Sequence, residues 1–448
     1  MSNEPTLNVI SSAPRCLTFV TLLALLSAAN PGFAVPTNIT WRADASVKET
    51  YDSNVYIEDT TPTNNVPGAV PANKGSAVTT VTPRIYFDYN ACTAFKATLS
   101  YTPDFTWYSS APSENNFTHR FGVNAGGAFD HAVWDLQNAF TYIDGSTQGP
   151  IFGRPQDVPA IGGIPLRDRR AAFIYRSGFR YTETFGKWMI RPVATAYVHD
   201  FKTDLRTNPP GGVYENYIDR QDISGGFDAG YQVAKDLRAV VGYRYGRQDQ
   251  FYGPFGPGGA IVKSPFGNSY NRILVGGEGA PLSWLKFGIL AGPDLRNFDN
   301  LSSNPLPAGF DPYEMLYYVD GFVTFLPTKQ DTVTLSNKRF EQPAFSSFSM
   351  YEDITYDLIW RHKFDAHWAA SAGFRLYIGD WQAPVSREDW IYTPSASVSY
   401  TWKNLSAELA YSYDWVENKA GTGPGQTAYA DGREFTRHLV SLAVKYSL

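Results

Sequence analysis

Apolar and polar residues alternate in this chain, in a pattern that recurs from about residue 38 to the C-terminus. One example lies near the C-terminus, where the apolar positions are Leu405, Ala407, Leu409 and Tyr411 and the positions between them are Ser406, Glu408, Ala410 and Ser412. The period is two residues, as in a β-strand, and not the 3.6 residues of an amphipathic helix. After residue 34 the sequence offers no amphipathic helix of useful length. The pattern therefore predicts an all-β protein.

The composition narrows the kind of all-β protein. Charged residues make up 18% of the 448 residues and aromatic residues 15%, whereas an average soluble domain has about 25% charged residues. The mean hydropathy is -0.29, and the only long apolar run lies near the N-terminus. A bundle of membrane-spanning helices needs several runs of about 20 apolar residues and is thus excluded. The net charge of -5 gives no basic signature for nucleic acid.

The N-terminus predicts export. Arg15 precedes an apolar run over residues 16–26, and residues 32–34 (Gly-Phe-Ala) form a small-x-small cleavage site. Residues 27–29 are a second candidate for cleavage, and a membrane anchor is the alternative, although the apolar run is shorter than a span. We expect a signal peptide over residues 1–34 and a single barrel domain over residues 35–448. Cleavage leaves Cys92 as the one cysteine, so no disulfide forms within the mature chain.

The connections between the predicted strands alternate in length. Short turns are expected at residues 91–92, 130–131, 234–236 and 403–404. Longer segments rich in Pro, Gly, Asn and Asp lie between the strand pairs, at residues 52–77, 144–169, 200–219, 247–268, 294–312 and 417–434. Shorter members of the same set lie at residues 110–116, 338–348 and 380–389. Short turns on one side and long loops on the other are typical of outer-membrane barrels. The count gives eighteen strands, from near Asn38 to Leu448, and an even number returns both termini to the periplasmic side.

A soluble β-sandwich would show the same alternation, but three features favour a membrane barrel. The faces that would meet solvent in a sandwich have few Lys or Glu residues. Tyr and Trp residues collect near strand ends, where an interfacial girdle would lie: Tyr142, Trp188, Trp360, Trp402 and Trp415. The last strand alternates to the final residue. Because hydrocarbon leaves the edge of an open sheet unsatisfied, we expect a closed, transmembrane, antiparallel up-and-down β-barrel in the outer membrane of a Gram-negative bacterium.

The final strand resembles the terminal β-signal that hands outer-membrane proteins to the barrel-insertion machinery, with Leu448 in place of the usual aromatic residue. More broadly, the mature chain resembles the uncharacterised β-barrel porin type 2 family of Gram-negative bacteria. The segments that carry the resemblance are residues 81–85 (VTPRI), 99–105 (LSYTPDF) and 115–120 (NNFTHR). The resemblance implies a barrel and a channel, and it supplies no substrate.

Four prolines fall inside predicted strands: Pro83, Pro103, Pro192 and Pro394. Proline has no N–H group and so removes a hydrogen bond from the ladder. We expect them to lie towards the outer rim, where a bulge or water can compensate.

Catalytic and metal-binding signals are weak. The sequence has no nucleophile-elbow, Cys-x-x-Cys, His-Glu-x-x-His or phosphate-loop spacing. Its six histidines are scattered, and His362 and His367 share one turn without a cysteine. The best acid–base pair is His199 beside Asp200. We expect no enzyme activity, no cofactor and no metal; a hydrolase with catalytic residues on barrel strands is the minor alternative.

The lumen suggests the function. Barrels of about 16–18 strands leave an aqueous channel, so the sequence predicts a porin-like channel for passive diffusion of small hydrophilic solutes. The alternatives are an outer-membrane component of exopolysaccharide assembly or export, and a structural barrel or receptor plugged by its loops. The expected partners are outer-membrane lipid and lipopolysaccharide, the insertion machinery and the solutes, and oligomers are compatible with this role.

If the apolar residues face lipid, the alternate positions face the lumen and their charges can be assigned to two walls. A basic wall would consist of Arg176, Arg180, Arg191, Arg238 and Arg244. An acidic wall would consist of Asp320, Asp353, Asp357, Glu408 and Asp414. Opposed walls would orient water and dipolar solutes. The alternative is that each arginine pairs locally with a neighbouring carboxylate.

The loop over residues 144–169 is the candidate constriction. It is rich in proline, and its arginines lie in and just after it, at Arg154, Arg167, Arg169 and Arg170. By analogy with general porins we expect it to fold into the lumen; a mobile surface loop is the alternative.

Overall fold

The computed structural model describes residues 38–57, 73–144, 171–201, 206–208, 212–214, 218–254, 261–344, 349–382, 386–420 and 434–448. Their strands are β1 (Ile39–Asp52), β2 (Ser76–Cys92), β3 (Phe95–Tyr101), β4 (Asp104–Tyr108), β5 (Asn116–Ala128), β6 (Ala132–Asp144), β7 (Ala172–Phe185), β8 (Trp188–Phe201), β9 (Arg206–Asn208), β10 (Gly212–Tyr214), β11 (Asp219–Ala234), β12 (Leu237–Pro254), β13 (Ile261–Lys263), β14 (Asn268–Leu282), β15 (Leu285–Phe298), β16 (Tyr313–Phe325), β17 (Asp331–Pro343), β18 (Met350–Lys363), β19 (Trp368–Trp381), β20 (Arg387–Trp402), β21 (Leu405–Ala420) and β22 (Phe435–Ser447). A three-residue 3-10 helix, Pro112–Glu114, precedes β5. Among these residues, no helix is long and apolar enough to span a membrane.

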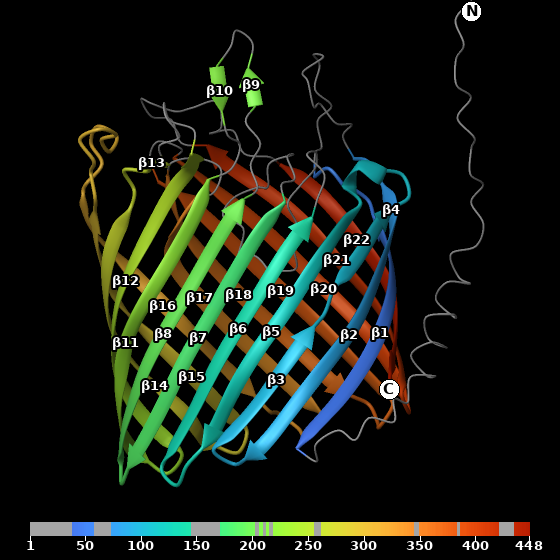
Figure 1. Ribbon diagram of the computed structural model, residues 1–448. Helices are drawn as coiled ribbons and strands as arrows, with labels where there is room; N and C mark the ends of the chain where they lie inside the picture. The colour runs from blue at the N-terminus through green and yellow to red at the C-terminus, as the bar shows by residue number, and fades with distance from the viewer. Residues whose placement is uncertain are drawn as a thin grey trace, which may run out of the picture.

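The strands form a closed antiparallel barrel (Figure 1). Twenty of the described strands belong to one sheet, in which β3 and β4 are two halves of one strand between β2 and β5, and β13 and β14 both pair with β12. The described residues therefore form eighteen spanning strands, as the sequence predicted. The ring closes where β1 pairs with β22, from Asp44 opposite Ser447 to Asp52 opposite Leu439.

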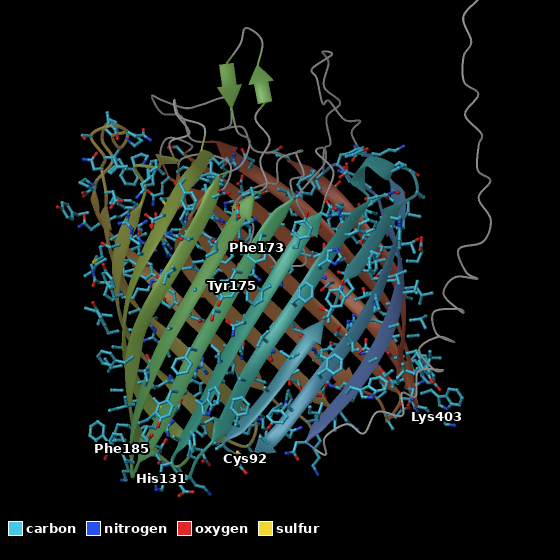
Figure 2. The ribbon with its side chains drawn as sticks, viewed as in Figure 1. Cys92, His131, Phe173, Tyr175, Phe185 and Lys403 are labelled. Atoms are coloured by element: carbon cyan, nitrogen blue, oxygen red, sulfur yellow. The ribbon has the colours of Figure 1, made fainter. Side chains whose placement is uncertain are left out.

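The period of two separates an apolar outer face from a polar inner face. On β8, Trp188 and Ile190 are 54% and 47% exposed, whereas Arg191 and His199 on the other face are 8% and 1% exposed. Many large apolar side chains on the strands are exposed, and Figure 2 shows the side chains along the whole height of the wall, with Phe173 of β7 among those labelled. This distribution, with apolar side chains outside and charged side chains inside, is the reverse of that in a soluble protein. It is the distribution expected of a barrel surrounded by lipid.

The two ends of the barrel differ as predicted. At one end, short turns join consecutive strands, and Figure 2 shows Cys92, His131 and Phe185 there. Several of these turns need a left-handed backbone: Gly186, Asp236 and Lys403 have φ angles of 61°, 57° and 52°. Positive φ at the central residues is what tight hairpin turns require. Most connections at the other end are longer.

Each proline within a strand coincides with a gap in one ladder. The β7–β8 ladder is interrupted beside Pro192, and the β20–β21 ladder beside Pro394. Pro103 separates β3 from β4, and Pro83 lies opposite this break, where β2 pairs with neither half. The missing N–H groups thus cost the pairing on one side only, and each strand continues beyond its proline.

One ladder stops half-way up the wall. β16 pairs with β15 along its whole length but with β17 only from Phe325 opposite Val333 to Val319 opposite Arg339. β17 and β18 nevertheless stay paired with each other as far as Pro343 opposite Met350. The end of this hairpin therefore leaves the wall beside β16.

Candidate pore and the hairpin that folds into it

The ends of β17 and β18 lie inside the barrel. We call residues 340–344 and 349–353 the inward hairpin. Side chains from the inner faces of β11 and β12 donate to its backbone: Arg220 Nη1 to the Pro343 carbonyl at 2.7 Å, and Gln250 Nε2 to the Ala344 carbonyl at 2.6 Å. Arg220 lies 123 residues before Pro343 in the chain. The hairpin is thus docked onto the inner wall by strands that are not its neighbours in the sheet.

Two further donors reach the carbonyl oxygen of Glu341. They are Gln248 Nε2 of β12 and Arg296 Nη2 of β15, each at 3.1 Å. Gln250 Nε2 also donates to the carbonyl of Ser349 at 3.1 Å. Because the hairpin has lost its sheet partner on the β16 side, these side-chain donors satisfy carbonyl groups that a ladder would otherwise have satisfied.

Apolar contacts hold the hairpin from two sides. Met350 is buried in a cluster with Phe266 and Phe298, at the outer ends of β14 and β15. Tyr351 stacks on Trp381 of β19, with ring centroids 5.0 Å apart. The hairpin therefore has a packed interface of its own and is more than a loop resting in the lumen.

A buried chain of charges lies beneath the hairpin. Arg296 Nε is 2.9 Å from Glu341 Oε2, and both side chains are 0% exposed. Asp294 Oδ2 accepts from Arg296 Nη2 and from Arg272 Nε, each at 2.9 Å. Buried charges of this kind persist only when paired, since an unpaired one would be costly.

Three members of the predicted basic wall make ion pairs with carboxylates of other strands. Arg191 lies 2.8 Å from Asp228 and 2.8 Å from Glu278. Arg238 lies 3.3 Å from Glu278, and Arg244 lies 2.7 Å from Asp228. Local pairing, the alternative that the sequence left open, therefore occurs at these three arginines.

The other two members of the predicted basic wall, Arg176 and Arg180, have different surroundings. Arg180 is exposed. The Arg176 guanidinium lies over the ring of Tyr197, 5.5 Å from its centroid. A net field across the pore is not decided by these contacts and stays a prediction.

The members of the predicted acidic wall also differ in their contacts. Asp357 pairs with Arg375 at 2.6 Å, directly across the β18–β19 ladder. Asp353 accepts from Gln342 Nε2 at 2.9 Å, and Asp414 accepts from Thr393 Oγ1 at 2.8 Å. Asp320 and Glu408 are exposed.

The predicted constriction loop lies outside the described residues, together with Arg154, Arg167, Arg169 and Arg170. Its place therefore stays a prediction. The inward hairpin was not predicted from the sequence, and it falls in one of the shorter predicted loops, residues 338–348. A usable signal was present in β12, where Gln248 and Gln250 place two amides on consecutive inner positions near the strand's outer end.

The residues singled out as the best acid–base pair do not face each other. His199 is buried and its Nδ1 lies 3.1 Å from the Tyr197 hydroxyl, whereas Asp200 is exposed on the opposite face of β8. Adjacent residues of a strand point to opposite faces. His362 Nδ1 lies 2.8 Å from Asp331 Oδ1. Within the described ranges, no group of three His, Cys, Asp or Glu residues could hold a metal ion.

Comparison with known proteins returns fold-level likeness alone. No family model and no curated protein matches the sequence. Among solved structures, the chain is similar to the FrpB iron transporter of Neisseria meningitidis, with 8% identity, 92% of this chain and 82% of that chain covered, and a TM-score of 0.46. It is also similar to the outer-membrane protein OpdK of Pseudomonas aeruginosa, with 9% identity, 91% and 98% covered, and a TM-score of 0.41.

A third similar structure is the outer-membrane channel DcaP of Acinetobacter baumannii, with 12% identity, 93% and 99% covered, and a TM-score of 0.40. These likenesses establish no family. The resemblance to the β-barrel porin type 2 family accordingly stays a prediction.

Proposed function

We propose that this protein is an outer-membrane channel of a Gram-negative bacterium through which small hydrophilic solutes diffuse passively, and that the inward hairpin narrows its pore. The observation that supports the proposal most is the closed ring of eighteen strands in the described residues, with apolar side chains outside and charged side chains inside. Such a ring is wider than its own side chains fill.

The polarity of the interior favours water in the lumen. Arg180, Asp320 and Glu408 are exposed although they occupy inner-face positions. An ionised group without water or a partner would cost several kcal/mol. Exposed charges on the inner face are therefore best explained by an aqueous passage.

The inward hairpin supports a restricted passage rather than a wide one. Its contacts described above lie on β11, β12, β15 and β19 and at the outer end of β14, which leaves the wall from β1 to β6 on the other side of the ring. We propose that solutes pass between the hairpin and that wall. The proposed role is passive and includes no catalytic step.

Reconstitution into planar bilayers tests the proposal. The full mature chain should produce discrete conductance steps, and liposomes that contain it should swell in small sugars faster than in oligosaccharides. A protein that inserts in folded form, yet gives neither conductance nor swelling, would contradict a diffusion channel. Conductance that appears only after the hairpin contacts are removed would identify a plugged barrel instead.

A further inference from the structure

Two strand edges are left without each other's pairing where the inward hairpin leaves the wall. β16 pairs with β15 along its whole length, but its ladder with β17 ends at the pair of Val319 and Arg339. Beyond that pair, residues 313–318 of β16 and residues 340–344 of β17 have no ladder with each other, although β17 stays paired with β18. An unpaired strand edge offers its N–H and C=O groups to another strand.

The register of the existing ladder fixes how these two edges would pair. Continued by three residues beyond Val319 and Arg339, it places Leu316 opposite Gln342. The hairpin can move as a unit, because its two strands are paired with each other as far as Pro343 and Met350. The free edge of β16 is thus a partner of matching length and register for the strand that has left it.

The docked hairpin is not packed on every side. A cavity of about 320 Å³ separates Phe340, Gln342 and Pro343 from the inner faces of β7, β8 and β11. Side chains that line a cavity lack the van der Waals contacts of a filled interface. The hairpin therefore gives up fewer contacts on leaving its place than a fully packed element would.

One carboxylate favours the docked position. Inside the barrel, Glu341 lies 2.9 Å from Arg296, and both side chains are fully buried. Glu341 is also directly opposite Glu352 in the β17–β18 ladder, and Glu352 pairs with Arg339 at 2.7 Å. Like charges opposite each other destabilise a ladder, so Glu341 benefits from the counter-charge of the inner wall. In the continued register, the same carboxylate would leave Arg296 and lie opposite Tyr317, which is 59% exposed.

We propose that the inward hairpin is a gate with two positions: docked on the inner wall, as in this structure, or paired with the free edge of β16 in the barrel wall. The wall position replaces side-chain donors by ladder hydrogen bonds, so the hairpin's carbonyl groups have partners in both positions. Segments with two alternative packings are a known basis of switching in proteins. The wall position clears the lumen and widens the pore. The inference rests on the proposed function, because the pore that it opens is the one proposed above.

A disulfide that traps the wall position tests the gate. The full mature chain carries Leu316→Cys with Gln342→Cys, and the exposed Cys92 is replaced by Ser. In the wall position the Cβ atoms of this test pair would lie about 4.5–5.5 Å apart, close to the spacing that a disulfide needs. Electrophoresis after mild oxidation in lipid vesicles measures the rate of cross-linking, and planar bilayers measure the conductance before and after reduction.

Two cysteine pairs serve as controls in the same background. Phe322→Cys with Ser336→Cys joins residues that are already opposite each other in the β16–β17 ladder, so it should cross-link without changing the conductance. Leu316→Cys with Ala344→Cys is out of register by two residues and should cross-link much more slowly than the test pair.

The role of the carboxylate is tested by adding Glu341→Gln to the test pair. Cross-linking should become roughly ten-fold faster or more, because the charge-assisted contact that favours the docked position is lost. Glu408→Gln, at an exposed inner-face position of β21, is the matched control and should leave the rate within about two-fold. An unchanged rate with Glu341→Gln would overturn the role of that carboxylate.

We expect the oxidised test pair to conduct more than the reduced one. A test pair that does not cross-link, while Phe322→Cys with Ser336→Cys does, would overturn the second position. Equal rates for the test pair and the out-of-register pair would overturn it too, since they would indicate general mobility. A cross-linked channel with the conductance of the reduced protein would overturn the gate. Cross-linking as expected without any bilayer conductance would instead refute the channel and leave the two positions standing.

Discussion

At the scale of single residues, the inner charges are organised across neighbouring strands. Asp228 of β11 accepts from Arg191 of β8 at 2.8 Å and lies 2.7 Å from Arg244 of β12. Inner positions of adjacent strands lie side by side, because side chains of paired residues share a face. Pairing therefore follows from register, and a charged inner face does not by itself imply an unbalanced field.

The buried pair beneath the hairpin yields the first prediction. Arg296→Met removes the guanidinium but keeps much of the side-chain volume, and leaves Glu341 and Asp294 with fewer counter-charges. Breaking one partner of a buried pair costs about 3–5 kcal/mol, so the free energy of unfolding in detergent should fall by that order. Denaturant titration measures it. The double variant Arg296→Met with Glu341→Gln should recover part of the loss; no loss in the single variant would refute the pairing.

The turn between β18 and β19 yields a prediction for pH. Asp365 Oδ1 accepts from the backbone N–H groups of Trp368 and His367, at 2.7 Å and 2.6 Å, and these bonds lower the pKa of its carboxyl. A lowered pKa in the folded state stabilises the protein at neutral pH, and this contribution disappears as the pH falls below about 3.9 through the lowered value. Asp365→Asn should therefore destabilise the protein at pH 7 and make little difference at the acid end. A destabilisation that is equal at both pH values would contradict this account.

At the scale of elements, the end of the β16–β17 ladder decides the shape of the lumen. Seven residues of β16 pair with β17, and at a tilt near 45° they rise only roughly 16 Å of an apolar band about 25 Å tall. Above them, a side-chain contact bridges the seam: the Arg339 guanidinium of β17 lies over the Tyr317 ring of β16, 6.0 Å from its centroid. Inside the barrel, the hydrogen bonds between the inward hairpin and the inner wall replace the backbone pairing that β17 loses to β16.

That docking can be loosened without touching the wall ladder. Gln248→Ala with Gln250→Ala removes the amide donors to Glu341, Ala344 and Ser349. Each lost hydrogen bond costs about 1 kcal/mol, so the hairpin should leave its place more often and the mean single-channel conductance should rise. Bilayer recordings measure this.

The control for the hairpin variant is Gln330→Ala, in the exposed turn between β16 and β17. It should keep the conductance of the wild-type channel. A test variant with unchanged conductance and unchanged stability would mean that the hairpin does not narrow the pore.

At the scale of the whole molecule, the distribution of charge around the ring should set ion selectivity. Arg180→Ala with Arg191→Ala removes two positive charges from the inner face and leaves Asp228 and Glu278 with fewer partners, so the pore should shift towards cations. Lumen substitutions tune selectivity and leave the barrel intact. Reversal potentials in a salt gradient measure the shift.

Removing carboxylates from the acidic wall tests the same distribution of charge. Asp353→Ala with Asp357→Ala should shift the pore towards anions. If both double variants insert and keep the wild-type reversal potential, these residues do not line an open pore.

The asymmetry of the two ends predicts the orientation in the membrane. Short turns face the periplasm in outer-membrane barrels. An epitope tag in the turn after Lys403 should stay hidden on intact cells, whereas a tag at the 3-10 helix Pro112–Glu114 should be labelled from outside. The reverse pattern of labelling would show that the orientation is wrong.

The strands, the faces to which their side chains point and the number of strands can all be predicted from the amino-acid sequence. Alternation such as that of residues 405–415 assigns each side chain to one face, and turn residues such as Asp236 and Lys403 mark where the chain reverses. These are local properties, because a strand and a tight turn are specified by residues next to one another in the chain. The eighteen spanning strands of the described residues and the two unlike ends follow from them.

The position of the inward hairpin and the pairing of the inner charges, by contrast, depend on contacts between residues far apart in the chain. The hairpin bends inward because Arg220 and Gln250 meet Pro343 and Ala344 more than ninety residues further along the chain. No periodicity encodes such a contact, since a strand that stays in the wall and one that leaves it alternate in the same way. The curvature of the ring brings these side chains within hydrogen-bond distance. The carbonyl groups freed from the ladder need such donors, because an unpaired carbonyl in the barrel interior costs about as much as a lost hydrogen bond.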